Sequence, residues 1–439
     1  MSGVKAVVVS HALEQGFDLV RVTSAQEFVE DRAIALERLE AGLMDGLPWY
    51  TESRVLRGTS PQELLPGARS IISLGLNYYQ GEFPEPSPGA HAGRVARYAW
   101  QRDYHQVMKK RMRAFVEGVS SRLGTKVAAR WYVDDGPMLD RAAAHRSGLG
   151  WFGKNTNILT PSFGSWLFLG QVITDLEIEA DRPLQKTCGA CVRCIDACPT
   201  GAIVAPYVID NARCISYLTI ENRGPIPVEL RPQMQDWVFG CDICQDVCPV
   251  NRKARAMAEP AFQKSPQPPF AGLPQNVILR SGATKNLGRG EAGSRSAPPP
   301  QTLRIGQGDT GKDPFGAHPP LAKGGQGGFL DLVELLELSE EEFRSRFRGT
   351  PILRAKRAGL QRNACVALGN LGDPSAIPAL CRALAEGESL VRGHAAWALG
   401  RMGTEASLRA LERARQAETD PKVLDEISSA LGEAPAARY

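Results

Sequence analysis

The sequence predicts three parts: a mixed α/β domain, a small cysteine-rich domain and a C-terminal α-solenoid. Three observations support this division. Over residues 1–180 short apolar runs alternate with helical patterns, eight of the ten cysteines fall between positions 188 and 248, and a helical segment recurs after residue 329. The predicted parts span 1–180, 181–258 and 329–439, with a Pro- and Gly-rich stretch at 259–328.

The first part has the pattern of strands that alternate with helices. Residues 69–76 and 166–174 are short, apolar runs rich in branched or aromatic side chains, which is typical of buried strands. Between them, residues 104–123 place apolar side chains at helical spacing. Strands and helices that alternate over this length predict a mixed α/β domain.

The cysteines form two blocks with iron–sulfur spacing. The first block is Cys188, Cys191, Cys194 and Cys198 before Pro199; the second is Cys214, Cys241, Cys244 and Cys248 before Pro249. In two-cluster ferredoxins the cysteine before proline ligates the other cluster. We therefore predict a ferredoxin-like domain with two [4Fe–4S] clusters, one on Cys188, Cys191, Cys194 and Cys248, the other on Cys198, Cys214, Cys241 and Cys244. Structural zinc is the alternative, which four cysteines at this spacing before a proline disfavour.

Composition and the N-terminus predict the compartment. A hydrophobic fraction of 43% and a charged fraction of 23% are ordinary for a soluble protein. The N-terminal apolar run is short and is followed by no cleavage signal, and no apolar stretch approaches the ~18 residues of a membrane span. We therefore expect a cytoplasmic protein with reduced thiols and no membrane partner.

The C-terminal part contains an internal repeat. Residues 363–372 align with residues 394–403 at an offset of 31, and a weaker copy follows at 427–432. A helix pair at this period resembles HEAT-like repeats. Cys365 and Cys381 lie on its apolar faces, where they are expected to fill the core. The stretch 259–328 is crowded with Pro, Gly and polar residues, so we expect a disordered insertion.

Basic residues are concentrated in two stretches. The net charge of +4 is too small to indicate a nucleic-acid partner. However, residues 101–130 hold eight Lys or Arg against two acids, and residues 341–362 hold seven against two. Clustered positive charge attracts a phosphate backbone. The solvated face of a helix is the alternative interpretation of each stretch.

Five runs carry a resemblance to a known family. Residues 97–112, 132–159, 214–232, 239–252 and 347–363 resemble epoxyqueuosine reductases, so that the resemblance covers nearly the whole chain except about 259–328. It implies a cobalamin-dependent oxidoreductase with two [4Fe–4S] clusters and HEAT-like repeats. The implied reaction reduces the epoxide of epoxyqueuosine to the alkene of queuosine in a tRNA anticodon loop.

The resemblance also assigns a catalytic residue. Asp134 matches the proton-donor aspartate of the family, and burial against the corrin would raise its pKa so that it holds a proton. Without the resemblance, the run from Asp134 to Pro137 is more typical of a turn. Asp135 departs from the small hydroxyl residue that relatives carry, and it leaves open which of the two carboxyls is the acid.

The cofactor and RNA contacts follow from the same resemblance. Arg57 and Arg97 match positions against the corrin, and Lys154 and Asn155 lie in a polar loop suited to its amides; a structural role is the alternative for each. No histidine ligand to cobalt is expected. The candidate phosphate contacts for the anticodon stem-loop are Arg354, Lys356, Arg357 and Arg362. An external electron donor and a monomeric protein are expected.

Two other functions remain open. Reductive dehalogenases also combine cobalamin with two clusters, although they usually carry an export signal and lack C-terminal repeats. A two-cluster electron-transfer protein without a substrate of its own is the second alternative, and failure to take up cobalamin would favour it.

Overall fold

The computed structural model describes residues 3–86, 89–257 and 328–432. The N-terminal body is built on a four-stranded antiparallel sheet of order β1-β2-β7-β4. Its strands are β1 (Leu19–Ser24), β2 (Ser70–Asn77), β7 (Leu167–Thr174) and β4 (Ala129–Tyr132). The strands predicted at 69–76 and 166–174 are therefore confirmed as β2 and β7, and the predicted helix is confirmed as α5 (Tyr104–Leu123).

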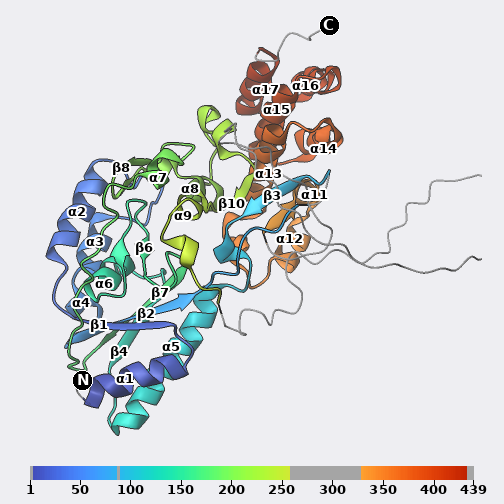
Figure 1. Cartoon of the computed structure of the whole chain (residues 1–439). Helices are drawn as coiled ribbons and strands as arrows, with labels where there is room; N and C mark the ends of the chain where they lie inside the picture. The colour runs from blue at the N-terminus through green and yellow to red at the C-terminus, as the bar shows by residue number, and fades with distance from the viewer. Residues whose placement is uncertain (1–2, 87–88, 258–327, 433–439) are drawn as a thin grey trace, which may run out of the picture.

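Helices cover both faces of this sheet (Figure 1). They are α1 (Gly3–Glu14), α2 (Val29–Glu40), α3 (Glu52–Gly58), α4 (Pro61–Leu64) and α6 (Asp140–Arg146), with α5. Because successive side chains of a strand point to opposite faces, Ile72 and Leu74 of β2 share a core with Phe115 of α5, whereas Ile71 packs with Ala143 of α6. A short hairpin of β5 (Trp151–Phe152) and β6 (Ile158–Leu159) follows α6.

The cysteine-rich region consists of short elements. They are α7 (Arg193–Asp196), β8 (Ile203–Ala205), β9 (Val208–Ile209), α8 (Ile215–Ile220) and α9 (Ile243–Asp246). One 3₁₀ turn, Asn211–Arg213, precedes α8, and two more, Val228–Leu230 and Pro232–Met234, lie between α8 and α9. The four-residue helices α7 and α9 each carry a cysteine, Cys194 and Cys244, and each ends just before a Cys-Pro pair. Turns of this kind direct closely spaced thiols to one side of the chain.

A second sheet joins three separate regions of the chain. Its order is β10-β3-β11, with β3 (Ala92–Val95) parallel to β10 (Trp237–Phe239) and antiparallel to β11 (Phe329–Asp331). The central strand thus comes from the N-terminal part, one neighbour from the cysteine-rich part and the other from the start of the repeats. One hydrophobic core runs from this sheet into the helices that follow.

The C-terminal helices form the predicted α-solenoid. They are α11 (Leu332–Glu337), α12 (Glu340–Arg346), α13 (Arg357–Leu371), α14 (Ile377–Glu386), α15 (Ser389–Met402), α16 (Glu405–Ala417) and α17 (Pro421–Gly432). Helices α13, α15 and α17 pack side by side, and α14 and α16 flank them (Figure 1). Gly372 and Gly403 end α13 and α15 in the left-handed conformation, 31 residues apart as the sequence repeat predicts.

The predicted disordered insertion lies outside the described residues, except for Gly328. Across the ranges that the structure describes, no helix has the length and apolar character needed to cross a membrane.

Candidate active site and cluster sites

Four thiols from distant stretches line one cavity in the cysteine-rich region. The cavity has a volume of about 120 Å³, and Cys188, Cys191, Cys194 and Cys248 contribute to its wall. Burial raises the pKa of Cys194, and the neighbouring Cys188 and Cys248 raise it further. The structure therefore brings the first predicted group of cysteines together, although Cys248 lies far along the chain from the other three.

The other four cysteines of the cysteine-rich region form a second group: Cys198, Cys214, Cys241 and Cys244. Burial raises the pKa of Cys241 well above its ordinary value, and Cys244 and Cys214 add to the rise. Burial likewise raises the pKa of Cys214, with a further contribution from Cys198. Because iron binds thiolates, loading of this group has to displace protons from its buried thiols.

The described residues offer no comparable site for a single metal ion. Among the described residues, no group of three or more His, Cys, Asp or Glu side chains is placed to hold one ion. A cubane cluster inserts four irons among its four thiolates and needs a wider arrangement than one ion does. The finding concerns single-ion sites and leaves both thiol groups as candidates for clusters.

Asp134 lies in the loop that follows β4. It is a non-glycine residue in the left-handed conformation, with φ of 56°. The Tyr104 hydroxyl donates a hydrogen bond to Asp134 Oδ2 over 3.0 Å, and the Tyr104 ring stacks on Phe168 of β7 at 4.2 Å. Asp134 is exposed in the protein alone.

The adjacent Asp135 has a different environment. Its carboxylate is paired with Lys109 of α5 and accepts a hydrogen bond from the Val133 N–H over 3.1 Å. Partial burial would raise its pKa, but these two partners outweigh burial and hold the pKa of Asp135 below its ordinary value. Asp135 is therefore an anchored anion, while Asp134 keeps one carboxylate oxygen free of the Tyr104 bond.

Tyr98 connects the Asp134 loop to the second thiol group. Burial raises the pKa of Tyr98, and the charges of Asp134 and, more weakly, Asp242 add to the rise. Asp242 follows Cys241 directly in the chain. The Tyr98 ring centre lies 6.1 Å from that of Tyr104, which bonds Asp134, and 6.1 Å from that of Phe239, two residues before Cys241.

The structure gives Arg97 a role other than the predicted cofactor contact. Its side chain is 1% exposed, and its guanidinium forms ion pairs with Asp242 at 3.1 Å and Asp246 at 2.7 Å. It also donates to the Gly81 carbonyl over 2.9 Å and lies over the Phe83 ring. We therefore withdraw Arg97 from the cofactor contacts, because its guanidinium has no surface left for another molecule.

The predicted polar loop lies at the first thiol group. Lys154 Nζ donates to the Gly189 carbonyl over 2.8 Å, and Asn155 Nδ2 donates to the Cys244 carbonyl over 3.2 Å. Both side chains are at least nine-tenths buried and line the wall of the cavity that holds Cys194. Their partners place them between the two thiol groups.

The donors around Tyr50 fit a large cofactor that carries amides and a phosphate. Of the four predicted contacts, Arg57 on α3 is the exposed one. The charges of Arg38, Arg54 and Arg141 all act on the Tyr50 hydroxyl, and Arg54 also donates to the Gly136 carbonyl of the Asp134 loop. Arg54 thereby supplies a hydrogen-bond donor and positive charge beside the loop of the candidate acid, as such a group would require.

Of the four basic residues predicted to contact RNA, two are exposed and two have their guanidinium groups bound by other parts of the protein. Arg354 and Lys356 are exposed. Arg357 pairs with Glu388 at 2.5 Å and with Glu340 at 3.4 Å. Arg362 is fully buried and donates to the carbonyls of Asn222, Gly224 and Leu218. Arg362 therefore has no free donor for a phosphate, and we withdraw it from the predicted contacts.

Sequence reasoning missed an unusual carboxyl six residues after Asp134, that of Asp140. It is the first residue of α6, and its Oδ1 atom is buried without a hydrogen-bond partner. Burial raises the pKa of Asp140 well above its ordinary value, and the charge of Asp134 raises it further. Its place in the run from Asp134 to Arg141 is the one sequence signal that could have singled it out.

The two thiol groups, the neighbouring carboxyls and the helical repeats define an iron–sulfur oxidoreductase with a large accessory surface. Family models match the same parts: a 4Fe–4S double cluster binding domain at 187–251, the family "Epoxyqueuosine reductase QueG, DUF1730" at 59–135 and HEAT repeats at 350–432. The chain belongs to the epoxyqueuosine reductase family. It is 34% identical to the epoxyqueuosine reductase of Xanthomonas campestris over 89% of this chain and 94% of the relative. Against that of Pseudomonas aeruginosa it is 35% identical over 89% and 92%.

Two solved structures of epoxyqueuosine reductases are similar to this chain over 98% of its length. A crystal structure of an epoxyqueuosine reductase with an epoxyqueuosine-modified tRNA-Tyr stem loop is 28% identical, covers 98% of this chain and 99% of that chain, and superposes with a TM-score of 0.79. The Bacillus subtilis enzyme, solved with an aspartate-bearing catalytic loop swung out of the active site, is 27% identical over 98% and 99% with a TM-score of 0.78.

Proposed function

We propose that this protein reduces epoxyqueuosine to queuosine within a tRNA anticodon loop. The observation that carries the proposal is the similarity, over 98% of the chain, to an epoxyqueuosine reductase crystallised with an epoxyqueuosine-modified stem loop. The reaction takes up two electrons and two protons. Both carbon–oxygen bonds of the epoxide break, the oxygen leaves as water, and the two ring carbons become an alkene.

The two thiol groups are proposed to hold the electron-transfer cofactors. Cys188, Cys191, Cys194 and Cys248 would ligate one [4Fe–4S] cluster, and Cys198, Cys214, Cys241 and Cys244 the other. The match to a double-cluster family model over 187–251 supports this assignment. Bound clusters would supply single electrons, drawn from an external donor. Lys154 and Asn155, whose partners are carbonyls of both cysteine blocks, would hold the cluster loops in position.

The surface around Tyr50 is proposed to hold cobalamin. Arg57, which the family resemblance suggested, would act there with Arg54 and Arg141, donating to the amides and the phosphate of the cofactor. When bound, cobalamin would supply the low-potential redox chemistry that side chains lack. A place beside the Asp134 loop is supported by Arg54, which donates to the Gly136 carbonyl of that loop.

Asp134 is proposed to protonate the departing oxygen. The Tyr104 hydroxyl fixes one carboxylate oxygen at 3.0 Å, which leaves the other free to carry the proton. A general acid must be protonated before the step, and cofactor and RNA together would bury this exposed side chain and favour its neutral form. Asp135 is the poorer candidate, because Lys109 holds it as an anion.

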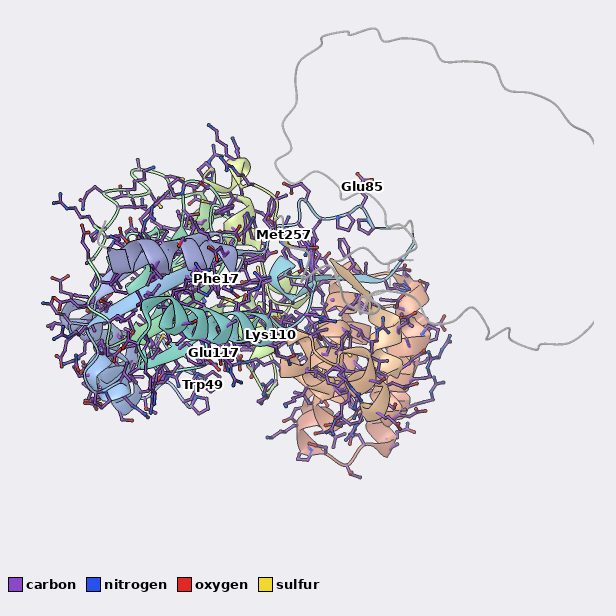
Figure 2. The ribbon with its side chains drawn as sticks, turned by 90° about the horizontal axis from the view of Figure 1, so that it is seen from below. Phe17, Trp49, Glu85, Lys110, Glu117 and Met257 are labelled. Atoms are coloured by element: carbon purple, nitrogen blue, oxygen red, sulfur yellow. The ribbon has the colours of Figure 1, made fainter. Side chains whose placement is uncertain are left out.

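The RNA is proposed to approach between the N-terminal body and the repeats. Arg354 and Lys356 are exposed basic residues at the start of the repeats. Lys110 of α5 lies on the side of the N-terminal body toward the repeats (Figure 2). Positive charge on both sides would attract the phosphates of a stem-loop. We expect the protein to act as a cytoplasmic monomer.

An anaerobic turnover assay tests the proposal. Protein loaded with clusters and cobalamin is given a strong reductant and tRNA that carries epoxyqueuosine, and digested nucleosides are identified by mass spectrometry. We expect a product one oxygen lighter that forms only with cobalamin. Asp134→Asn is expected to lower the rate by about 10²- to 10⁴-fold, as loss of a general acid does, with iron and cobalamin content unchanged. Asp135→Asn is the matched control, and equal losses in both variants would contradict the assignment.

A further inference from the structure

An exposed tryptophan lies at the junction of the three parts of the chain. Trp49 is 39% exposed and follows the turns after α2 (Figure 2). A single exposed apolar side chain is unremarkable in itself. Trp49 differs because the guanidinium carbon of Arg354, from the start of the repeats, lies 5.7 Å from the centre of its ring. The two side chains therefore pair across the boundary between the N-terminal body and the repeats.

The loop that carries Trp49 is fixed to the cysteine-rich region. The Asn211 backbone N–H donates to the Leu43 carbonyl and the Asn211 side chain to the Asp45 carbonyl, each over 2.9 Å. Gly46 has φ of +84°, and a Cβ at this position would lie 1.8 Å from the Tyr217 hydroxyl oxygen. Only glycine meets both conditions, so the loop that leads to Trp49 is held close to α8.

Arg354 is also held in place, and it lies beside the candidate acid. Its guanidinium is ion-paired with Glu221, and its carbonyl accepts a hydrogen bond from Arg223 over 2.8 Å. The stretch that carries Arg354 meets the start of α5, where the Asp103 N–H donates to the Gly349 carbonyl over 2.7 Å and the neighbouring Tyr104 donates to Asp134. Half of the Arg354 side chain is nevertheless exposed. The indole and guanidinium thus border the entrance to the Asp134 site.

We propose that Trp49 and Arg354 form a stacking platform for an unpaired RNA base next to Asp134. The inference rests on the proposed function and names the side chains that read the loop. Proteins recognise single-stranded loops by splaying bases out and stacking them on aromatic rings or on guanidinium planes. Trp49 offers a ring face at a fixed position, and Arg354 adds a planar cation with charge for the adjacent phosphate. Exposed Lys356, two residues from Arg354, supplies a further phosphate contact.

Binding measurements on three variants test the platform. The full-length, cluster-loaded protein is titrated into a fluorescent epoxyqueuosine-modified stem-loop over a series of salt concentrations. Loss of one stacking partner corresponds to roughly a 5- to 150-fold loss of affinity. A loss of this size is expected for Trp49→Ala, with an unchanged salt slope. Trp49→Phe keeps a ring and is expected to retain most of the affinity. Arg354→Gln is expected to reduce the salt slope by about one as well.

Abasic stem-loops identify the stacked base. One loop base is removed at a time. Removal of the stacked base should weaken binding to the wild type, whereas the same removal should not weaken binding to Trp49→Ala any further. Leu13→Ala is the control: it also removes an exposed apolar side chain, 52% exposed on α1, and should bind as the wild type does.

The outcomes separate this inference from the proposed function. A wild type that binds no stem-loop refutes the proposed function and the platform with it. A wild type that binds, together with a Trp49→Ala variant of equal affinity, refutes the platform alone. The platform is also refuted if Trp49→Ala binds RNA normally but no longer takes up cobalamin, because Trp49 then belongs to the cofactor site.

Discussion

Replacement of Arg97 by methionine tests the buried charge network behind the second thiol group. The Arg97 side chain is 1% exposed, its ion pairs reach Asp242 at 3.1 Å and Asp246 at 2.7 Å, and the Asp242 side chain is 2% exposed. Removing one partner of a buried pair leaves an uncompensated charge, which costs about 3–5 kcal/mol. We expect Arg97→Met to lower the free energy of unfolding by about this amount. The loss should be accompanied by reduced iron content, because Asp242 lies in the loop between Cys241 and Cys244.

The assay is urea denaturation of the cluster-loaded protein under anaerobic conditions, followed by circular dichroism. The matched control is Arg113→Gln, which removes an exposed pair with Glu117 whose side chains are 73% and 66% exposed. Such a pair contributes about 0.3–0.5 kcal/mol. The double variant with Asp242→Asn should lose less stability than the sum of the single changes, since the two residues are in contact. Equal midpoints for Arg97→Met and Arg113→Gln, or strict additivity in the double variant, would refute the reasoning.

Three further predictions concern Asp140, Arg362 and Cys194. Asp140→Asn should raise the melting temperature more at pH 8 than at pH 5. The pKa of Asp140 is higher in the folded than in the unfolded protein, so ionisation of this carboxyl costs stability as the pH rises above the unfolded-state pKa, and asparagine removes that cost. An equal gain in melting temperature at both pH values would contradict this. Arg362→Met should destabilise the protein by about 2–4 kcal/mol by leaving buried carbonyls without donors, and unchanged resistance to proteolysis would count against it. Cys194→Ser should remove about half of the iron and labile sulfide, whereas Cys365→Ser in the repeat core should remove none; elemental analysis of both decides the point.

Local patterns in the sequence predicted the regular elements well. β2, β7 and α5 lie where apolar periodicity placed them, because burial of a strand or a helix face leaves its period in the sequence. The 31-residue repeat likewise predicted the ends of α13 and α15, where glycine adopts the left-handed conformation. The grouping of the thiols followed from cysteine spacing, which reflects the geometry of the cluster they would share.

Tertiary placement of charged residues could not be predicted in the same way. Arg97 and Arg362 belong to a residue type that is mostly exposed, and nothing local distinguishes them from Arg354. What buries them is a set of partners from distant stretches: Asp242 for Arg97, and the carbonyls around Asn222 for Arg362. Trp49 was missed for the same reason, because its significance comes from a neighbour some 300 residues away.

The sheet that joins the three regions has a consequence for biosynthesis. β3, its central strand, leaves the ribosome first, and its second neighbour β11 follows only about 230 residues later. At typical elongation rates of ~5–20 residues per second, this interval is roughly 10–50 s. A strand with an unpaired edge is a template for incorrect pairing with other chains. The nascent protein is therefore most prone to aggregate in the interval after β3 is synthesised and before β11 can pair with it. Conditions that slow translation between these two strands should lower the yield of native protein.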